Sequence, residues 1–286
     1  MNKLPIFHVA FYRFAVIDAP EALAASLRLL TVDLLGSILV APEGINGVLS
    51  GTAAALTDFA HAVTALHYQN GVFTGMAFKR SACTTAPFAR MKVHVRQEIV
   101  ALGVTGVTGV TGAPAGSAAA ASAAAGRGST DVSPQEWRKL IADASVVVLD
   151  NRNSFEYRLG HFRSAVDPQV DNFRDFSAYI ADNAPAWRAA GKRVAMYCTG
   201  GIRCEKTSAW MQDFGIDVFQ LEGGILNYFQ QVPDAELEWK GECFVFDNRI
   251  ALDTHLQETA TTAEDVFSAP EDAWRLARAQ RLDAAG

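Results

Sequence analysis

Positive charge, cysteine and long apolar runs are all scarce in this sequence of 286 residues. Asp and Glu (31) outnumber Lys and Arg (25), so no bulk positive charge would hold the chain on nucleic acid or an anionic membrane. Four cysteines without regular spacing do not form the framework of a secreted disulfide protein, which favours a reducing compartment. No apolar run is long enough to cross a bilayer, and the N-terminus lacks the pattern of a secretory signal. These absences predict a cytoplasmic protein without a membrane partner.

Apolar residues, by contrast, make up 50% of the chain, which is enough to build a substantial core, and the length favours two domains. The clearest boundary is residues 104–128, VTGVTGVTGAPAGSAAAASAAAGRG, whose small side chains cannot pack a core of their own. Glycine recurs there at every third position, but the run is too short for a collagen helix and its spacing is not that of a nucleotide loop. We predict a flexible linker.

Residues 1–103 alternate strand-like and helical patterns in an order close to βαββαβ with one extra element, which predicts an α+β ferredoxin-like (acylphosphatase-like) domain. Within it, residues 36–51 are expected to form two strands joined by a turn at Gly44 to Gly47. The predicted helices occupy residues 20–35 and 52–67, and further predicted strands occupy residues 4–14, 72–79 and 91–98.

Residues 129–246 have the pattern of an α/β domain with a parallel sheet. Ser133, Pro134 and Glu136 form a capping box that opens a helix, and the apolar run SVVVLDNR follows as a strand buried on both faces. RVAMYCTGGIRCEKTSAWMQDFG then predicts a strand, a glycine turn and a helix over residues 205–214. Residues 247–286 are an acidic C-terminal extension, which either docks on the body or stays mobile.

Cys198 lies where a predicted strand ends and a turn leads into a helix. Backbone N–H groups converge at such a turn and the helix dipole favours an anion, so the Cys198 thiolate is expected to be stabilised and nucleophilic. Gly200 and Gly201 would let the backbone curl around the sulfur, and Arg203 adds a fixed positive charge. The alternative is that Cys198 is a buried structural cysteine, but this combination of features favours a reactive cysteine.

The surroundings of Cys198 supply further candidates. Cys204 could resolve an oxidised Cys198 as a disulfide, or it could simply pack under the helix. Asp150 and Arg152 follow a strand at the sheet edge where α/β proteins place their sites. Glu156 and His161 are interpreted as structural hydrogen-bonding residues, and Cys83 and Cys243 as structural cysteines.

The segment YCTGGIRCEKTSAW, with VVLDNRNSFEYRLGHFRSAVDP before it and QLEGGILNYFQ after it, resembles a rhodanese domain. Together with WKGECFVFDNR and the N-terminal APEGINGVLSG, it resembles the tRNA uridine hydroxylase family of rhodanese-domain proteins over most of residues 1–255. Relative to that family, residues 104–128 look like an insertion, and the tail carries no zinc-binding cysteine cluster.

The resemblance implies an oxidoreductase that modifies tRNA by hydroxylating carbon 5 of the wobble uridine, with molecular oxygen as co-substrate and tRNA, not DNA, as partner. It implies that Cys198 is the catalytic cysteine and that the active-site loop Thr199, Gly200, Gly201, Ile202 and Arg203 cradles it. Asp150 and Arg152 match positions that organise the loop in rhodaneses. The sequence contains no flavin or nicotinamide fingerprint and no convincing metal triad, so no organic cofactor or metal is predicted.

A basic segment in the N-terminal half is the candidate RNA-binding region. Residues 79–96 contain five basic residues and no acidic one, namely Lys79, Arg80, Arg90, Lys92 and Arg96. Arg90, Lys92 and Arg96 alternate along RMKVHVR, so they would share one strand face with His94 and could contact a phosphate backbone. An ordinary solvated strand face explains the pattern equally well.

Two alternatives to a hydroxylase stay open on the sequence. The Cys198 loop equally suits a sulfurtransferase that carries sulfur as a persulfide, and turnover of thiosulfate without tRNA would favour it. A noncatalytic binding module would keep full function after Cys198→Ser. A cysteine phosphatase is disfavoured, because four residues separate Cys198 from Arg203 where phosphatases use five.

Overall fold

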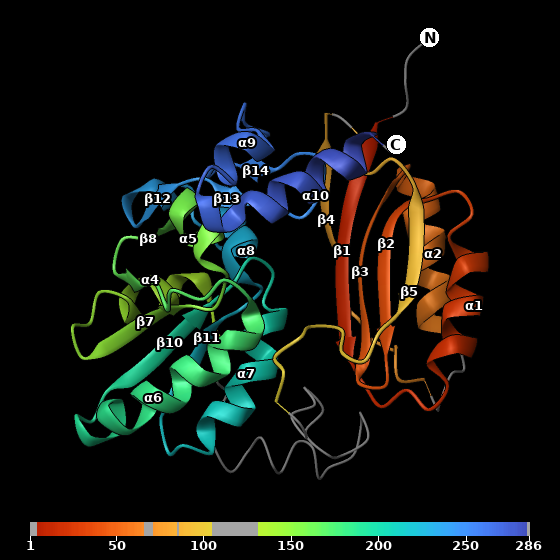
Figure 1. The fold of residues 1–286 in the computed structure, drawn as a ribbon. Coiled ribbons are helices and arrows are strands. Elements are labelled where there is room, and N and C mark those ends of the chain that lie inside the picture. Colours follow the sequence, from red (N-terminus) through yellow and green to blue (C-terminus); the bar gives the residue numbers. More distant parts are fainter. Residues whose placement is uncertain (1–4, 66–70, 85, 105–130, 285–286) are drawn as a thin grey trace. The chain divides into compact units, whose positions relative to one another are not determined.

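The computed structural model describes residues 5–65, 71–84, 86–104 and 131–284. These residues form two compact units, the first within residues 5–100 and the second within residues 101–284 (Figure 1). All but the first residue of the predicted linker, residues 104–128, lies outside the described residues, and the predicted domain boundaries stay predictions.

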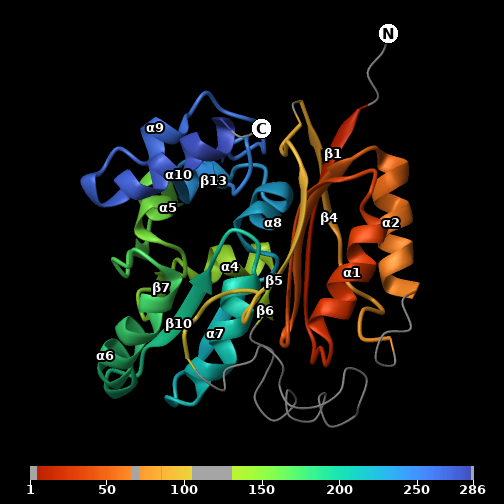
Figure 2. The same cartoon turned by 45° about the vertical axis from the view of Figure 1, so that its right-hand side comes forward.

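The first unit is a five-stranded sheet in the order β4-β1-β3-β2-β5. All its pairs are antiparallel except β2 with β5. Helices α1 and α2 cover one face of this sheet (Figure 2). The order of the first four strands is that of the ferredoxin-like plan, and β5 is the predicted extra element. The elements are β1 (Ile6–Phe14), α1 (Pro20–Leu30), β2 (Leu35–Ala41), β3 (Gly44–Gly51), α2 (Ala53–Ala65), β4 (Lys79–Cys83) and β5 (Met91–Val95).

Two local predictions in this unit are wrong. The β2–β3 turn consists of Pro42 and Glu43, whereas Gly44 and Gly47 lie within β3. These glycines serve close packing against β1, because a Cβ atom at Gly44 would lie 2.0 Å from the carbonyl oxygen of Arg13, and one at Gly47 would strike a phenylalanine ring.

Residues 72–79 were expected to form a strand, but residues 71–75 form turns and β4 begins only at Lys79. Gly71 and Gly75 both have positive φ there, which ends any extended conformation. The apolar pattern arises because Phe73 and Met76 are buried in the core from a loop.

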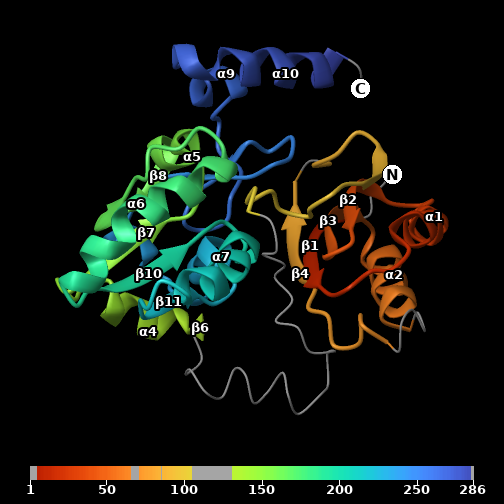
Figure 3. The same ribbon diagram turned by 60° about the horizontal axis from the view of Figure 1, so that its bottom comes forward.

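The second unit is built on a fully parallel sheet in the order β6-β11-β10-β7-β9. Helices α4 and α7 lie on opposite sides of it (Figures 1 and 3). The capping box of Ser133 and Glu136 is present at the start of α4, as predicted. The elements are β6 (Asp131–Val132), α4 (Pro134–Leu140), β7 (Val146–Asp150), α5 (Ser154–Leu159), β8 (Gly160–Phe162), β9 (Ala165–Val166), η2 (Phe173–Asp175), α6 (Phe176–Ala189), β10 (Arg193–Tyr197), α7 (Ile202–Gln212), β11 (Val218–Leu221) and α8 (Gly224–Gln231).

The C-terminal part of the second unit docks on this body. Phe155 of α5 and Phe244 pack with Phe267 in one buried cluster, their ring centroids 5.1 to 5.9 Å apart. Figure 2 shows α9 and α10 on the side of α5 and β13. The predicted extension from residue 247 therefore begins inside a hairpin. The remaining elements are η3 (Ala235–Leu237), β12 (Trp239–Gly241), β13 (Cys243–Phe244), β14 (Ala251–Leu252), α9 (Ala263–Val266), η4 (Pro270–Asp272) and α10 (Ala273–Ala284).

Candidate active site

Cys198 directly follows β10, and the loop after it leads into α7 at Ile202. Its Sγ accepts a hydrogen bond of 3.1 Å from the backbone N–H of Gly201, whose φ of +99° favours glycine. Among the described residues, no atom beyond the adjoining chain lies within 4 Å of the place a Cβ of Gly200 would occupy. Gly201 thus curves the backbone around the sulfur, and the described residues leave room for a side chain at Gly200.

The loop holds Cys198 as a thiolate. Burial by itself raises the pKa of this thiol, but a hydrogen bond from the Cys204 thiol, the charge of Arg203 and backbone N–H groups together lower it to about 5. Burial and the hydrogen bond to Cys198 raise the pKa of Cys204 well above its usual range, so that thiol stays protonated and donates. The Asn151 side-chain N–H lies 3.8 Å from the Cys204 sulfur on its other side. A redox partnership between Cys198 and Cys204 stays a prediction.

Arg203 is fixed by a buried carboxylate from another element. Both its terminal nitrogens donate to Glu156 of α5 at 2.8 Å, and the Glu156 side chain is fully buried. Burial raises the pKa of Glu156, but the paired charge and hydrogen bonds of Arg203 outweigh this and lower it. Because the ion pair is bidentate, the guanidinium cannot rotate away from the loop. Glu156 is thus more than the local hydrogen-bonding residue that the sequence predicted.

A second buried ion pair fixes the strand end in front of Cys198. Asp150 accepts from Arg152 at 2.6 and 2.8 Å, and its carboxylate also accepts 2.6 Å from the hydroxyl of Tyr197. Arg152 in turn donates to the carbonyl of Gly160 at 2.6 Å. Asp150 and Arg152 do not reach the sulfur; they position the residue that precedes it.

The start of α8 holds the loop through backbone hydrogen bonds. The N–H of Ile225 donates to the carbonyl of Cys198 at 3.0 Å, and that of Leu226 donates to the carbonyl of Thr199 at 3.3 Å. A Cβ atom at Gly224 would lie 2.5 Å from the Cys198 carbonyl oxygen, so only glycine permits this approach. The segment LEGG makes this contact, and its glycine pair was the one local signal that could have indicated a close approach.

Three other residues near the site differ in how well the sequence indicated them. Asn151 was not singled out, although it is fully buried beside the Cys204 thiol and also donates to Thr207. The Nδ1–H of His161 donates to the carbonyl of Tyr157 at 2.8 Å, and its ring stacks on that of Tyr157. Burial raises the pKa of Cys243 to about 12, so its thiol is inert at neutral pH.

The candidate RNA-binding residues fall into two groups in the first unit. Lys79 and Arg80 belong to β4 and the others to the region of β5, and these are the two edge strands of the sheet, about 19 Å apart at ordinary strand spacing. Arg80 faces the helices, since it donates to Thr57 of α2 at 3.0 Å. Alternation along β4 puts Lys79 on the other face.

Two members of the β5 group lie within the strand, on the face opposite to that of Val93. Lys92 and His94 flank Val93, which points into the core. Burial and the positive charges of Arg96 and Lys92 lower the pKa of His94, because these charges lie close to it. Arg90 and Arg96 lie just outside β5, so a face shared by all four residues stays a prediction.

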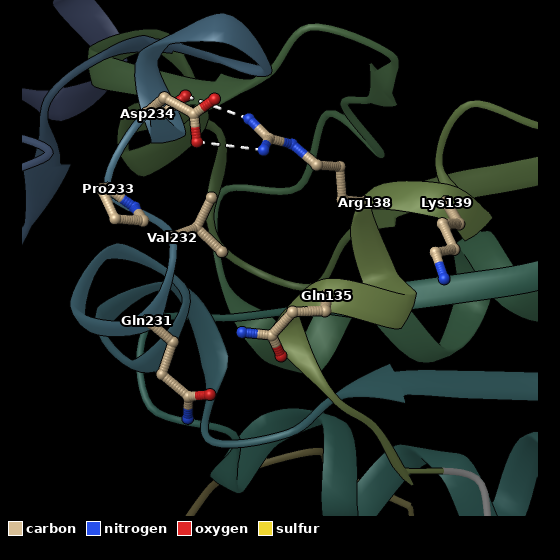
Figure 4. A pocket seen from close by; sticks show the side chains of 7 residues that line it. All are labelled: Gln135, Arg138, Lys139, Gln231, Val232, Pro233 and Asp234. Carbon is tan, nitrogen blue, oxygen red and sulfur yellow. Dashed lines mark hydrogen bonds and ion pairs between the residues drawn. The ribbon is translucent and has the colours of Figure 1, made fainter.

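A separate hollow of about 330 Å³ lies between α4 and the end of α8 (Figure 4). An ion pair of 3.0 Å joins Arg138 to Asp234 beside it. None of its lining residues belongs to the Cys198 loop; they are Gln135, Arg138, Lys139, Gln231, Val232, Pro233 and Asp234. In the part of the chain that the structure describes, no helix could cross a membrane and no cluster of three or more His, Cys, Asp or Glu side chains could hold a metal.

Comparison with known proteins matches both units. Residues 6–99 match the UPF0176 acylphosphatase like domain, and residues 133–231 match the Rhodanese-like domain. A curated tRNA uridine(34) hydroxylase of Synechococcus elongatus is 42% identical over 252 residues, which cover 87% of this chain and 86% of that relative. This chain belongs to the tRNA uridine(34) hydroxylase family.

Two further family members come from other bacteria. The tRNA uridine(34) hydroxylase of Deinococcus radiodurans is 39% identical over 257 residues, covering 89% of this chain and 78% of the relative. The tRNA uridine(34) hydroxylase of Brucella anthropi is 39% identical over 265 residues, which cover 91% of this chain and 79% of that relative. The family resemblance read from the Cys198 segment is confirmed, and so is the predicted acylphosphatase-like domain followed by an α/β rhodanese-like domain.

Proposed function

We propose that this chain hydroxylates carbon 5 of the wobble uridine of tRNA, with molecular oxygen as co-substrate and Cys198 as the catalytic residue. The observation that carries the proposal is the Cys198 thiolate, held at the carboxyl end of a strand of a parallel sheet in a chain that matches tRNA uridine(34) hydroxylases over most of its length. A thiolate there is a nucleophile at neutral pH, available to the ring of a base that enters the loop.

Each part of the loop has a distinct task in this proposal. The Gly201 N–H and the Arg203 charge stabilise negative charge at the reacting sulfur. The Cys204 thiol donates a hydrogen bond to the same sulfur and stays protonated itself. Glu156 is a positioning residue because it holds Arg203, and Asp150 is one because it holds Tyr197, the residue before Cys198.

The β5 edge of the first unit is the better candidate for contacting the tRNA backbone. Lys92 lies in β5, and Arg90 and Arg96 flank its two ends. Burial, and after it the positive charges of Arg96, Lys92 and Arg28, lower the pKa of His94, which places these charges close to that side chain. Neutralising one of these side chains should weaken tRNA binding and reduce its salt dependence by about one ion for each phosphate that the side chain pairs with. Lys79 and Arg80 act separately in this proposal, because they lie at the opposite edge of the sheet.

The decisive experiment is nucleoside mass spectrometry of tRNA from cells that lack this protein, complemented with the intact chain or with Cys198→Ser. We expect only the intact chain to restore 5-hydroxyuridine and the nucleosides derived from it. Full rescue by Cys198→Ser would contradict a catalytic Cys198 and favour a noncatalytic module. No loss of these nucleosides, combined with turnover of thiosulfate by the purified protein without tRNA, would favour the sulfurtransferase.

A further inference from the structure

Phe246 is an exposed aromatic residue on a hairpin of buried ones. It follows β13, and 61% of its side chain is exposed, whereas Phe244 and Val245 are 5% and 4% exposed. Its ring meets that of Phe244 edge-on, with centroids 4.9 Å apart and an interplanar angle of 88°. An exposed phenylalanine by itself is ordinary, so its significance depends on what lies beside it.

The neighbour of Phe246 is the guanidinium of the active-site loop. The central carbon of Arg203 lies 5.9 Å from the centroid of the Phe246 ring. Arg203 is also the charge that lowers the pKa of Cys198, so the ring borders the same loop as the thiolate. Among the described residues, room remains for a side chain at Gly200 of that loop. An aromatic surface and a cation thus meet at the border of the thiolate loop.

The hairpin that carries the ring is held firmly. Asp247 accepts hydrogen bonds from the backbone N–H and both side-chain donors of Arg249, at 3.0, 2.8 and 2.6 Å, and each of the two side chains is 3% exposed. The N–H of Val245 donates to the carbonyl of Ile250 at 2.8 Å, and Ile250 has a φ of +61°. A β-branched residue in that region is strained, so the surrounding contacts must fix it. Presenting the ring on a fixed hairpin reduces the entropy lost when a ligand binds.

A nucleobase is the ligand that fits these features. Its two faces are flat and apolar, its strand is anionic, and proteins bind unpaired RNA bases by stacking them on aromatic rings and beside arginine. An enzyme that reacts at a ring carbon of a base must also take that base out of its stack, which leaves a face to be covered. We propose that Phe246 stacks on the target uracil of the RNA substrate and holds it over the Cys198 loop. This inference rests on the proposed function and makes Phe246 a positioning residue for it.

The test is a double-mutant cycle on binding with the full chain. The proteins are the wild type and Phe246→Leu, which keeps an apolar side chain but removes the aromatic face. The RNAs are an anticodon stem-loop with uridine at the wobble position and the same RNA with an abasic site there. We expect Phe246→Leu to weaken binding of the uridine RNA by about 5- to 150-fold. We expect it to bind the abasic RNA as the wild type does, because the stacking partner is gone from both complexes.

Two matched variants complete the design. Phe246→Trp restores a larger aromatic face and should bind the uridine RNA at least as tightly as the wild type does. Trp274→Leu removes another exposed aromatic ring of the same unit, 49% exposed and over Arg275, and should leave binding unchanged. Thermal unfolding of each variant shows that it is folded.

The outcomes separate the two proposals. Equal losses from Phe246→Leu on both RNAs, or no loss on the uridine RNA, would overturn stacking. Normal rescue of 5-hydroxyuridine by the wild type in the same strain would then leave the hydroxylase proposal intact. Conversely, if the wild type fails that rescue while the cycle shows coupling, the stacking contact stands and the hydroxylation fails.

Discussion

Replacing the Cys204 thiol tests directly how the loop stabilises the Cys198 thiolate. Replacing Cys204 by Ala removes the S–H group that donates to the Cys198 sulfur and leaves the loop amides and Arg203 in place. A hydrogen bond to a charged group contributes about 1.5 to 3 kcal/mol, and 1.36 kcal/mol corresponds to a change of one in pKa. The pKa of Cys198 should therefore rise from about 5 to about 6 to 7 in Cys204→Ala.

The assay is the rate at which iodoacetamide alkylates Cys198 as a function of pH, followed by peptide mass spectrometry. Only the thiolate reacts, so the midpoint of the rate profile reports the pKa of the sulfur. Cys204→Ser retains a hydroxyl donor and should keep the midpoint near that of the wild type. Cys83→Ala, in the other unit, controls for the loss of a cysteine elsewhere.

Two results would refute this reasoning. If Cys204→Ala keeps the wild-type midpoint, the Cys204 thiol contributes packing alone, and the loop amides with Arg203 suffice for the thiolate. If Cys204→Ala and Cys204→Ser raise the midpoint equally, the volume of the sulfur matters and its proton does not.

Three further predictions concern the same loop. Since the pKa of Cys198 is about 5 in the native protein and about 8.5 in an unfolded chain, the native state binds fewer protons between these values. In that window the free energy of unfolding of the wild type should therefore rise with pH relative to that of Cys198→Ser, by up to about 1.4 kcal/mol per pH unit. This stabilisation should vanish as pH falls through about 5. Urea titrations at a series of pH values measure both. Gly201→Ala, at a φ of +99°, should cost about 1 to 2 kcal/mol of stability, whereas Gly200→Ala should cost almost none in the same titrations. Glu156→Gln should destabilise the second unit by about 3 to 5 kcal/mol in thermal unfolding, because it leaves Arg203 buried without a countercharge; a loss below 1 kcal/mol would contradict that account.

The parts of this site that the sequence predicted are those fixed by neighbouring residues. The buried run before Cys198, the glycine pair after it and the arginine at the helix start all act within a few residues, and the structure realises each of them. The capping box at Ser133 is likewise a contact over three residues. The contacts behind such patterns form between residues close in sequence, so the patterns can be recognised without the tertiary structure.

The parts that the sequence did not predict depend on contacts between distant residues. Glu156 lies 47 residues before Arg203, and nothing in its local pattern distinguishes an ion pair in the active site from a helix cap. The glycines of β3 resemble a turn until the neighbouring strand is placed against them, as Gly44 shows. Phe73 and Met76 belong to a short apolar run that resembles a strand, although they fill the core from a loop.

One device recurs at two places around the candidate site and ties its elements together. The sequence Asp-Asn-Arg occurs at residues 150–152 and again at residues 247–249, and in both the aspartate accepts from the backbone N–H, Nε and Nη2 of the arginine. The first copy fixes the end of β7 against Tyr197, and the second fixes the hairpin that presents Phe246. Ion pairs buried this deeply add little net stability compared with apolar packing, because desolvating both charges is costly. Their use twice at the borders of one loop is better explained by geometry. A planar, bidentate pair holds a turn in one conformation, and a thiolate and a stacking ring that must meet the same base require that both turns be held.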